Sequence, residues 1–127
     1  MIILVINCGS SSIKYQLLDM KSDEVYDLLA KGIVEKIGLE TGRLQHTVIG
    51  KDKVVKDLPV PDHKVGMKLV LEALTDSEHG VLKSLDDIEA VGHRIVHGGE
   101  FFSSSALVNE DVMKKIEICC DFAPLHN

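Results

Sequence analysis

The chain opens with an unbroken apolar run, residues 2–6, which ends at Asn7 and leads into a glycine and three serines. Such a run between turn signals is typical of a strand that is buried on both faces. Gly9 supplies the turn, and a strand pattern restarts at Ile13. A tight loop of hydroxyls and backbone N–H groups, with Lys14 just beyond it, suits a phosphate.

The loop is not a Walker A loop, which requires Gly-Lys-Ser/Thr followed by a helix. The residues after Lys14 alternate as a strand, so a phosphate would sit on a hairpin. Two interpretations stay open from the pattern alone. The loop binds phosphate, or it is an ordinary hairpin whose serines hydrogen-bond to the turn backbone.

Composition narrows the possible classes of protein. The 127 residues allow one domain with a sizeable core, and the formal charge of −6 argues against a nucleic-acid or anionic-membrane surface. The first apolar run is too short for a signal peptide or a membrane span, so we predict a cytoplasmic protein. Three cysteines, two of them adjacent, predict reduced thiols and no disulfide framework. For Cys8 the pattern favours a packed side chain over a nucleophile.

Strand patterns dominate the first half of the chain. They cover residues 2–7, 13–19, 24–36, 43–49 and 53–58. Pro59 and Pro61 end the last of them, and Asp62 can cap a helix that reaches about Asp76. His46 lies in an alternating, partly exposed strand pattern, and we predict no catalytic role for it.

The second half carries one more strand and one more helix. Residues 89–96 read as a buried strand that carries Arg94 into a double glycine, and Asn109 can cap a second helix. Asp86 and Asp87 fit either a magnesium site or, with greater weight, a solvated turn. Strands in a meander followed by helix, strand and helix predict an α/β layered fold.

Three segments resemble the signature sequences of acetate kinases, and they occur in the order found in that family. They are residues 6–17 (Ile-Asn-Cys-Gly-Ser-Ser-Ser-Ile-Lys-Tyr-Gln-Leu), residues 91–100 (Val-Gly-His-Arg-Ile-Val-His-Gly-Gly-Glu) and residues 123–127 (Ala-Pro-Leu-His-Asn). Propionate kinases share much of this pattern and stay open as an alternative.

The resemblance implies a fold and a domain organisation. The expected fold is the ribonuclease-H-like domain of the acetate and sugar kinase, chaperone ATPase and actin superfamily, a mixed sheet flanked by helices. Residues 1–127 would be the N-terminal lobe of a longer chain, truncated before the C-terminal lobe that completes the ATP site. Because the second lobe is missing, we expect these residues alone to be inactive. The resemblance also implies that the full-length protein is a homodimer.

The resemblance also implies a reaction and a set of site residues. The reaction is Mg²⁺-dependent (or Mn²⁺-dependent) phosphoryl transfer between ATP and acetate, with ADP and acetyl phosphate as products. Arg94 and His126 would be catalytic, and Arg94 would also orient the substrate carboxylate. The remaining expected roles are phosphate binding by Asn7, Ser10, Ser12 and Lys14, a substrate pocket from Val96 and Leu125, and a metal contact by Asn7.

Three further classes of function compete with the kinase interpretation. One is a structural or interaction fragment that dimerises through a partly apolar face built to meet another lobe. A stand-alone phosphate- or nucleotide-binding module would bind ATP without a second lobe. A nuclease would need clustered acids on the first strand to hold two metals, and that strand offers only Asn7.

Overall fold

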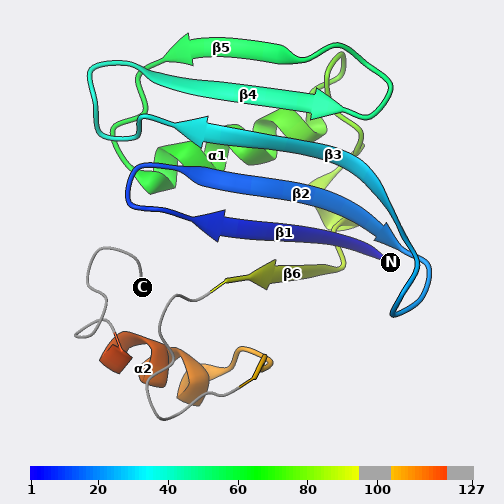
Figure 1. Ribbon diagram of the computed structural model, residues 1–127, viewed down its shortest axis with the longest axis vertical. Coiled ribbons are helices and arrows are strands. Elements are labelled where there is room, and N and C mark those ends of the chain that lie inside the picture. Colours follow the sequence, from blue (N-terminus) through cyan, green and yellow to red (C-terminus); the bar gives the residue numbers. More distant parts are fainter. Residues whose placement is uncertain (95–103, 120–127) are drawn as a thin grey trace. The chain divides into compact units, whose positions relative to one another are not determined.

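The computed structural model describes residues 1–94 and 104–119 (Figure 1). The chain divides into two compact units, Met1–His93 and Arg94–Asn127. The candidate site residues between positions 7 and 14 belong to the first unit.

A six-stranded mixed sheet forms the body of the first unit. Its strand order is β5-β4-β3-β2-β1-β6, in which β1 to β5 form an antiparallel meander and β6 runs parallel to β1 (Figure 1). The strands are β1 (Ile2–Cys8), β2 (Ile13–Met20), β3 (Tyr26–Glu35), β4 (Gly42–Val48), β5 (Val54–Leu58) and β6 (Ala90–His93). The five expected strands of the meander are confirmed to within two residues at each end. The sixth, expected over residues 89–96, ends at His93, so Arg94 follows the strand and does not lie in it.

Helix α1 (His63–Thr75) covers one face of this sheet, against β2 and β3. The Asp62 carboxylate accepts a hydrogen bond from Val65 N–H at 2.9 Å, which confirms Asp62 as the N-cap. The helix buries Gly66, Val70 and Leu74, which lie one turn apart on a single face.

Gly66 allows α1 to approach the sheet closely. A Cβ atom at this position would lie 3.0 Å from Ile13 Cδ1 and 3.3 Å from Ile37 Cδ1. The first turn of α1 is therefore held against the start of β2, directly after the serine loop.

The prediction that β1 and β6 are fully buried strands is wrong. Val5 in β1 is 36% exposed and Val91 in β6 is 59% exposed, whereas Leu4 and Ile6 are buried. In the first unit α1 packs against only one face of the sheet, and β6 lies at its edge. An apolar run reports hydrophobicity but not which of its residues a neighbouring layer will cover.

The two acids at 86 and 87 form a solvated turn, as predicted. They belong to a short 3₁₀ helix, η1 (Leu85–Asp87), and the Asp87 carboxylate accepts hydrogen bonds from the N–H groups of Lys83 and Ser84, both at 3.2 Å. Ser84 is the N-cap of this helix, and its side chain and the Asp87 carboxylate together form a capping box. The carboxylate of Asp87 is therefore already used by hydrogen bonds within its own turn.

The second unit contains α2 (Glu110–Cys119). Asn109 accepts a hydrogen bond from Val112 N–H at 2.9 Å, which confirms the expected cap. Lys115 pairs with Asp111 at 3.0 Å, one turn apart. No helix in residues 1–94 and 104–119 is long and apolar enough to cross a membrane.

A polar pair lies inside the core between β2 and β4. His46 is only 1% exposed, and its Nδ1 atom lies 2.6 Å from the hydroxyl of Tyr15. Between them lies Gly32 of β3, which pairs with Tyr15 on one side and with His46 on the other. The tyrosine ring crosses β3 at this glycine, because a Cβ there would collide with the ring and with the Gln45 carbonyl oxygen.

The partners of His46 fix its protonation state. Its Nε2 atom lies 3.0 Å from the carbonyl oxygen of His79, which can only accept, so Nε2 carries a hydrogen. Nδ1 then accepts from the hydroxyl of Tyr15. Burial lowers the pKa of His46 and raises the pKa of Tyr15, so both stay neutral. These bonds explain a buried histidine without any catalytic role.

We expect Gly32→Ala to destabilise the chain by about 1–3 kcal/mol or more, because the added methyl must displace the Tyr15 ring or the β4 backbone. Urea unfolding followed by circular dichroism measures this change. Gly92→Ala is the matched control, since no described atom lies within 4 Å of its Cβ position. Equal midpoints for the two variants would contradict the crossing geometry.

We also expect the free energy of unfolding to decrease as the pH is lowered below about 6.5. The pKa of His46 is lower in the folded chain than in the unfolded chain, so the unfolded state takes up the proton first as pH falls. The stabilisation from neutral His46 is complete at pH values above the pKa of histidine in the unfolded chain. As the pH falls from there towards the pKa of His46 in the folded chain, the free energy of unfolding decreases by up to about 1.4 kcal/mol per pH unit.

The measurement compares urea midpoints of the wild type and His46→Gln between about pH 7.5 and 5.5. Glutamine does not titrate, so the variant should lose less stability over this range, although it is less stable throughout. Parallel pH profiles would show that His46 does not carry the effect.

Candidate functional site

The serine loop between β1 and β2 is the centre of the candidate site. Gly9 N–H donates to the Ser12 carbonyl oxygen at 2.8 Å and closes the loop, and Ser10 and Ser11 at its tip are exposed. A Cβ on Gly9 would lie 2.8 Å from Ser12 Oγ, so a larger residue would push that hydroxyl away. The loop is therefore a tight, solvent-facing turn.

Two carbonyl groups of this loop are held from the inside of the fold. The Gly9 oxygen accepts from His63 Nε2 at 2.7 Å, and the Ser11 oxygen accepts from Ile37 N–H at 3.0 Å. His63 is the first residue of α1, and Ile37 follows β3. The loop is thus tied to two elements that are distant in sequence.

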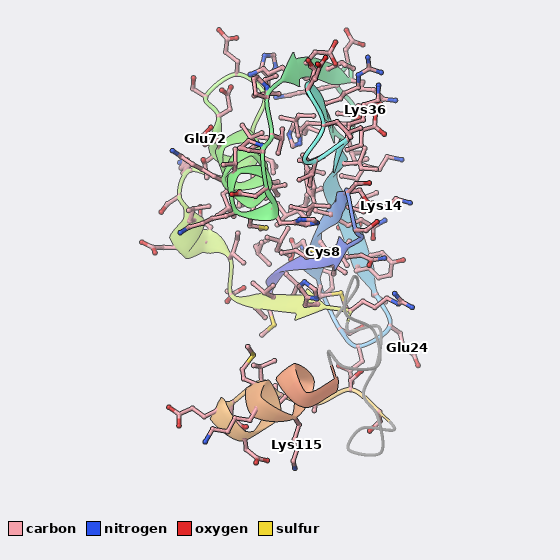
Figure 2. The ribbon with its side chains drawn as sticks, turned by 90° about the vertical axis from the view of Figure 1, so that its left-hand side faces the viewer. Cys8, Lys14, Glu24, Lys36, Glu72 and Lys115 are labelled. Atoms are coloured by element: carbon pink, nitrogen blue, oxygen red, sulfur yellow. The ribbon has the colours of Figure 1, made fainter. Side chains whose placement is uncertain are left out.

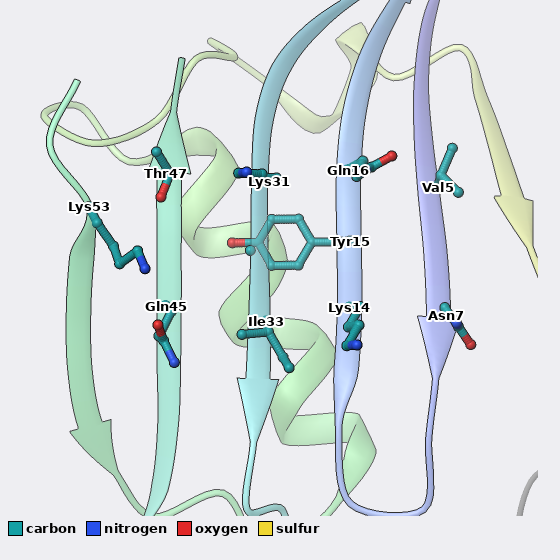
Figure 3. A pocket seen from close by; sticks show the side chains of 11 residues that line it. Val5, Asn7, Lys14, Tyr15, Gln16, Lys31, Ile33, Gln45, Thr47 and Lys53 are labelled. Atoms are coloured by element: carbon teal, nitrogen blue, oxygen red, sulfur yellow. The ribbon is translucent and has the colours of Figure 1, made fainter. Parts of the chain in front are cut away.

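Asn7 and Lys14 lie opposite one another where β1 and β2 meet the loop. Both are exposed, and Lys14 projects from the side of the sheet away from α1 (Figure 2). They line a depression of about 440 Å³ on that open face, together with Gln16, Gln45 and Thr47 (Figure 3).

The charge of this depression is opposite to that of the whole chain. Its lining includes Lys14, Lys31 and Lys53, which we call the lysine face, and none of its lining residues is acidic. The formal charge of the chain is −6. A local cluster of ammonium groups on an acidic protein attracts anions to this face.

The carboxyl ends of β1 and β6 lie at the same edge of the sheet. The two strands are parallel, and Ile6 of β1 pairs with His93 of β6. The serine loop leaves from the end of β1, and Arg94 is the next residue after His93, at the start of the second unit. Ligands of open α/β sheets bind at such carboxyl ends.

The structure brings four of the predicted site residues into one region: Asn7 and Lys14 on the strands, and Ser10 and Ser12 in the loop between them. Val96, Leu125 and His126 lie outside the described residues, so their predicted roles stay predictions.

Sequence reasoning missed the two anchors of the loop and two members of the lysine face. Nothing in the sequence around His63 indicates that its side chain binds the Gly9 carbonyl oxygen, 54 residues away. Lys31 could have been found, because it pairs with Gln16 in the β2–β3 register and thus shares a face with Lys14.

Cys8 has the properties of a packed side chain. It is partly buried, and burial raises the pKa of its thiol above the usual value of 9.0. At neutral pH the thiol is protonated, whereas the thiolate is the nucleophile. The arrangement favours packing over covalent catalysis.

The described residues do not form a metal site by themselves. No group of three or more His, Cys, Asp or Glu side chains in residues 1–94 and 104–119 could hold a metal ion. Asn7 offers one amide oxygen opposite the positive Lys14, whereas Mg²⁺ in proteins is usually bound by carboxylates and substrate phosphates. The donors of the loop fit phosphate oxygens better than they fit a cation.

Comparison with known proteins gives a consistent result. The sequence model described as "Acetokinase family" matches residues 2–127. The chain is 55% identical over 125 residues to an acetate kinase from Thermoanaerobacter pseudethanolicus and 58% identical over 124 residues to one from Clostridium acetobutylicum. Each alignment covers 98% of this chain but 30% of the relative, so the chain spans about 30% of the length of these curated relatives.

Solved structures agree in fold. The crystal structure of Porphyromonas gingivalis acetate kinase matches 99% of this chain with a TM-score of 0.91 and 46% identity, over 31% of that protein. A propionate kinase from Francisella tularensis matches 98% of this chain with a TM-score of 0.81 and 36% identity, over 30% of that protein. The expected α/β fold of the ribonuclease-H-like class is confirmed. By its sequence and its fold, the chain belongs to the acetokinase family.

Proposed function

We propose that the protein carrying this chain transfers the γ-phosphoryl group of ATP reversibly to acetate, giving acetyl phosphate and ADP. The observation that carries the proposal is the shared edge of β1 and β6, from which the serine loop and Arg94 both leave. Identities of 55–58% to proteins named acetate kinase support it. The chain spans about 30% of those relatives, so the activity belongs to the complete protein.

The reaction needs electrostatic help more than covalent help. A carboxylate oxygen of acetate attacks the γ-phosphorus, and the bond to the β–γ bridging oxygen breaks with its electron pair leaving on ADP. No proton is transferred in this step. Positive charge and aimed donors around the moving group lower the barrier.

The loop residues supply the nucleotide contacts in this proposal. Lys14 gives a positive charge, Ser10 and Ser12 give hydroxyl and backbone donors, and Asn7 gives an amide. Their common region at the end of β1 supports this role. Asn7 is also the proposed contact to the Mg²⁺ or Mn²⁺ that accompanies ATP, although none of the residues that line the depression beside it is acidic.

Arg94 is the proposed catalytic residue of the described part of the chain. Its guanidinium is permanently charged and can hold a carboxylate or two phosphoryl oxygens at once. His126 is the second proposed catalytic residue, as a donor to the phosphoryl oxygens, and Val96 and Leu125 are proposed to enclose the methyl group of acetate.

The proposal includes an organisation for the complete protein. Residues 1–127 form its N-terminal ribonuclease-H-like lobe, a second lobe completes the ATP site, and the full-length protein is a homodimer in the cytoplasm.

The main alternative is that the complete protein is a propionate kinase. The likeness to the Francisella tularensis propionate kinase supports this alternative. One methylene in an aliphatic pocket changes specificity by only about 1–3 kcal/mol, so the pocket residues alone do not distinguish an acetate kinase from a propionate kinase. The ratio of kcat/KM for acetate to kcat/KM for propionate distinguishes them. A stand-alone nucleotide-binding module would bind ATP and transfer nothing.

We expect Arg94→Leu in the complete protein to lower kcat/KM for acetyl phosphate formation by roughly 100-fold or more, because the transferring group loses its positive partner. Arg94→Lys should recover part of the rate, since it keeps the charge but not the planar fork. Trapping acetyl phosphate with hydroxylamine measures the rate.

Arg43→Leu is the matched control for this experiment. Arg43 makes an exposed ion pair with Asp57 at 2.8 Å on β4 and β5, and exposed pairs contribute little to stability. Its rate should stay near that of the wild type. An Arg94→Leu enzyme as active as Arg43→Leu would refute the role given to Arg94.

Residues 1–127 expressed alone should form no acetyl phosphate from ATP and acetate. Their described part holds no group of three or more His, Cys, Asp or Glu side chains that could bind the metal, and a second lobe is needed to exclude water from the reacting phosphate. The same hydroxylamine assay, run at enzyme concentrations far above those used for the complete protein, tests this. Turnover by the short chain would mean that one lobe is sufficient.

A further inference from the structure

The serine loop is held by hydrogen bonds that come from inside the fold. Gly9 O accepts from His63 Nε2, Ser11 O accepts from Ile37 N–H, and Gly9 N–H donates to Ser12 O. All three lie between 2.7 and 3.0 Å. Within the described part of the chain, the N–H groups of Ser10 and Ser12 donate to no protein acceptor.

Peptide geometry connects the bound carbonyls with these N–H groups. In a trans peptide the C=O of one residue and the N–H of the next point in opposite directions, and none of the described peptides is cis. When His63 holds the Gly9 carbonyl inward, the Ser10 N–H must point outward. The Ile37 bond to the Ser11 carbonyl does the same for the Ser12 N–H. Both outward N–H groups are then available to donate hydrogen bonds to an anion such as a phosphate.

His63 is itself held in place by α1. Asp62 caps the helix immediately before it. Gly66, one turn later, lets the helix lie close to the Ile13 side chain at the end of the loop, since a Cβ atom on residue 66 would lie only 3.0 Å from Ile13 Cδ1. Since Gly9 O can only accept, Nε2 of His63 carries the hydrogen. The imidazole thus works as a fixed donor on a rigid support.

We infer that His63 is a positioning residue for the nucleotide phosphates. It acts through the Gly9–Ser10 peptide and does not touch the substrate. Without its donor, this peptide is released to turn, and a carbonyl oxygen facing a phosphate repels it where an N–H would bind it. The inference rests on the proposed function, because it takes the phosphate groups of ATP as the anion that the loop binds.

The test uses three variants of the complete protein. His63→Leu removes the donor and keeps an apolar side chain. His63→Gln keeps an N–H donor of similar reach. His79→Leu is the matched control, because the His79 side chain makes an exposed pair with Glu78 at 3.7 Å, away from the loop.

We expect His63→Leu to raise both the KM and the equilibrium Kd for ATP about tenfold, the loss of one hydrogen bond to a charged group. The KM for acetate should change less than twofold. His63→Gln should stay within about threefold of the wild type in ATP affinity, and His79→Leu should be unchanged. A merely structural histidine would lower the melting temperature or kcat without this selective change, and glutamine would not restore the affinity.

The inference is overturned if His63→Leu binds ATP as tightly as the wild type, or if His63→Gln binds it as weakly as His63→Leu. Titration calorimetry with ATP in the absence of acetate separates it from the proposed function. If the wild type makes no acetyl phosphate but its ATP affinity follows the expected order, the role of His63 holds and the acetate kinase proposal fails. If the wild type binds no ATP, both fail.

Discussion

The close packing of α1 on β2 and β3 is the contact on which the rest of the structure depends. Gly66 permits it, because any side chain there would meet Ile13 and Ile37. The contact buries one face of the sheet and holds the first turn of α1 beside the serine loop. Helix α1 therefore contributes buried residues to the core and also carries His63, which holds the serine loop of the candidate site.

The fold was largely predictable from the sequence, but its layers were not. Alternating and unbroken apolar patterns located the strands, and Asp62 and Asn109 located the starts of both described helices. The patterns could not tell that Val5 and Val91 would stay exposed, because exposure depends on which face a helix covers. That information lies in packing between distant elements, whereas sequence periodicity is local.

The candidate site divides in a similar way. The loop residues and Arg94 could be predicted, because glycine, serine, lysine and arginine carry recognisable phosphate chemistry next to a strand. His63 could not, since its importance arises from a hydrogen bond across 54 residues. In the lysine face Lys14 was predicted, whereas finding Lys31 requires the register between β2 and β3. A local motif names the donors that face a ligand, and the tertiary fold supplies the groups that aim them.

The parallel pairing of β1 with β6 has a consequence for how the chain folds. Strands β1 to β5 join neighbours along the chain through short turns, so the meander closes small loops. In contrast, β6 must reach β1 across 87 residues, where Glu89 N–H meets the Ile2 carbonyl at 2.9 Å and Ile2 N–H meets the Glu89 side chain at 2.8 Å. Closing so long a loop costs more entropy and slows folding. The strand that carries Arg94 is thus expected to join last, so a nascent chain can have an ordered serine loop before its arginine arrives.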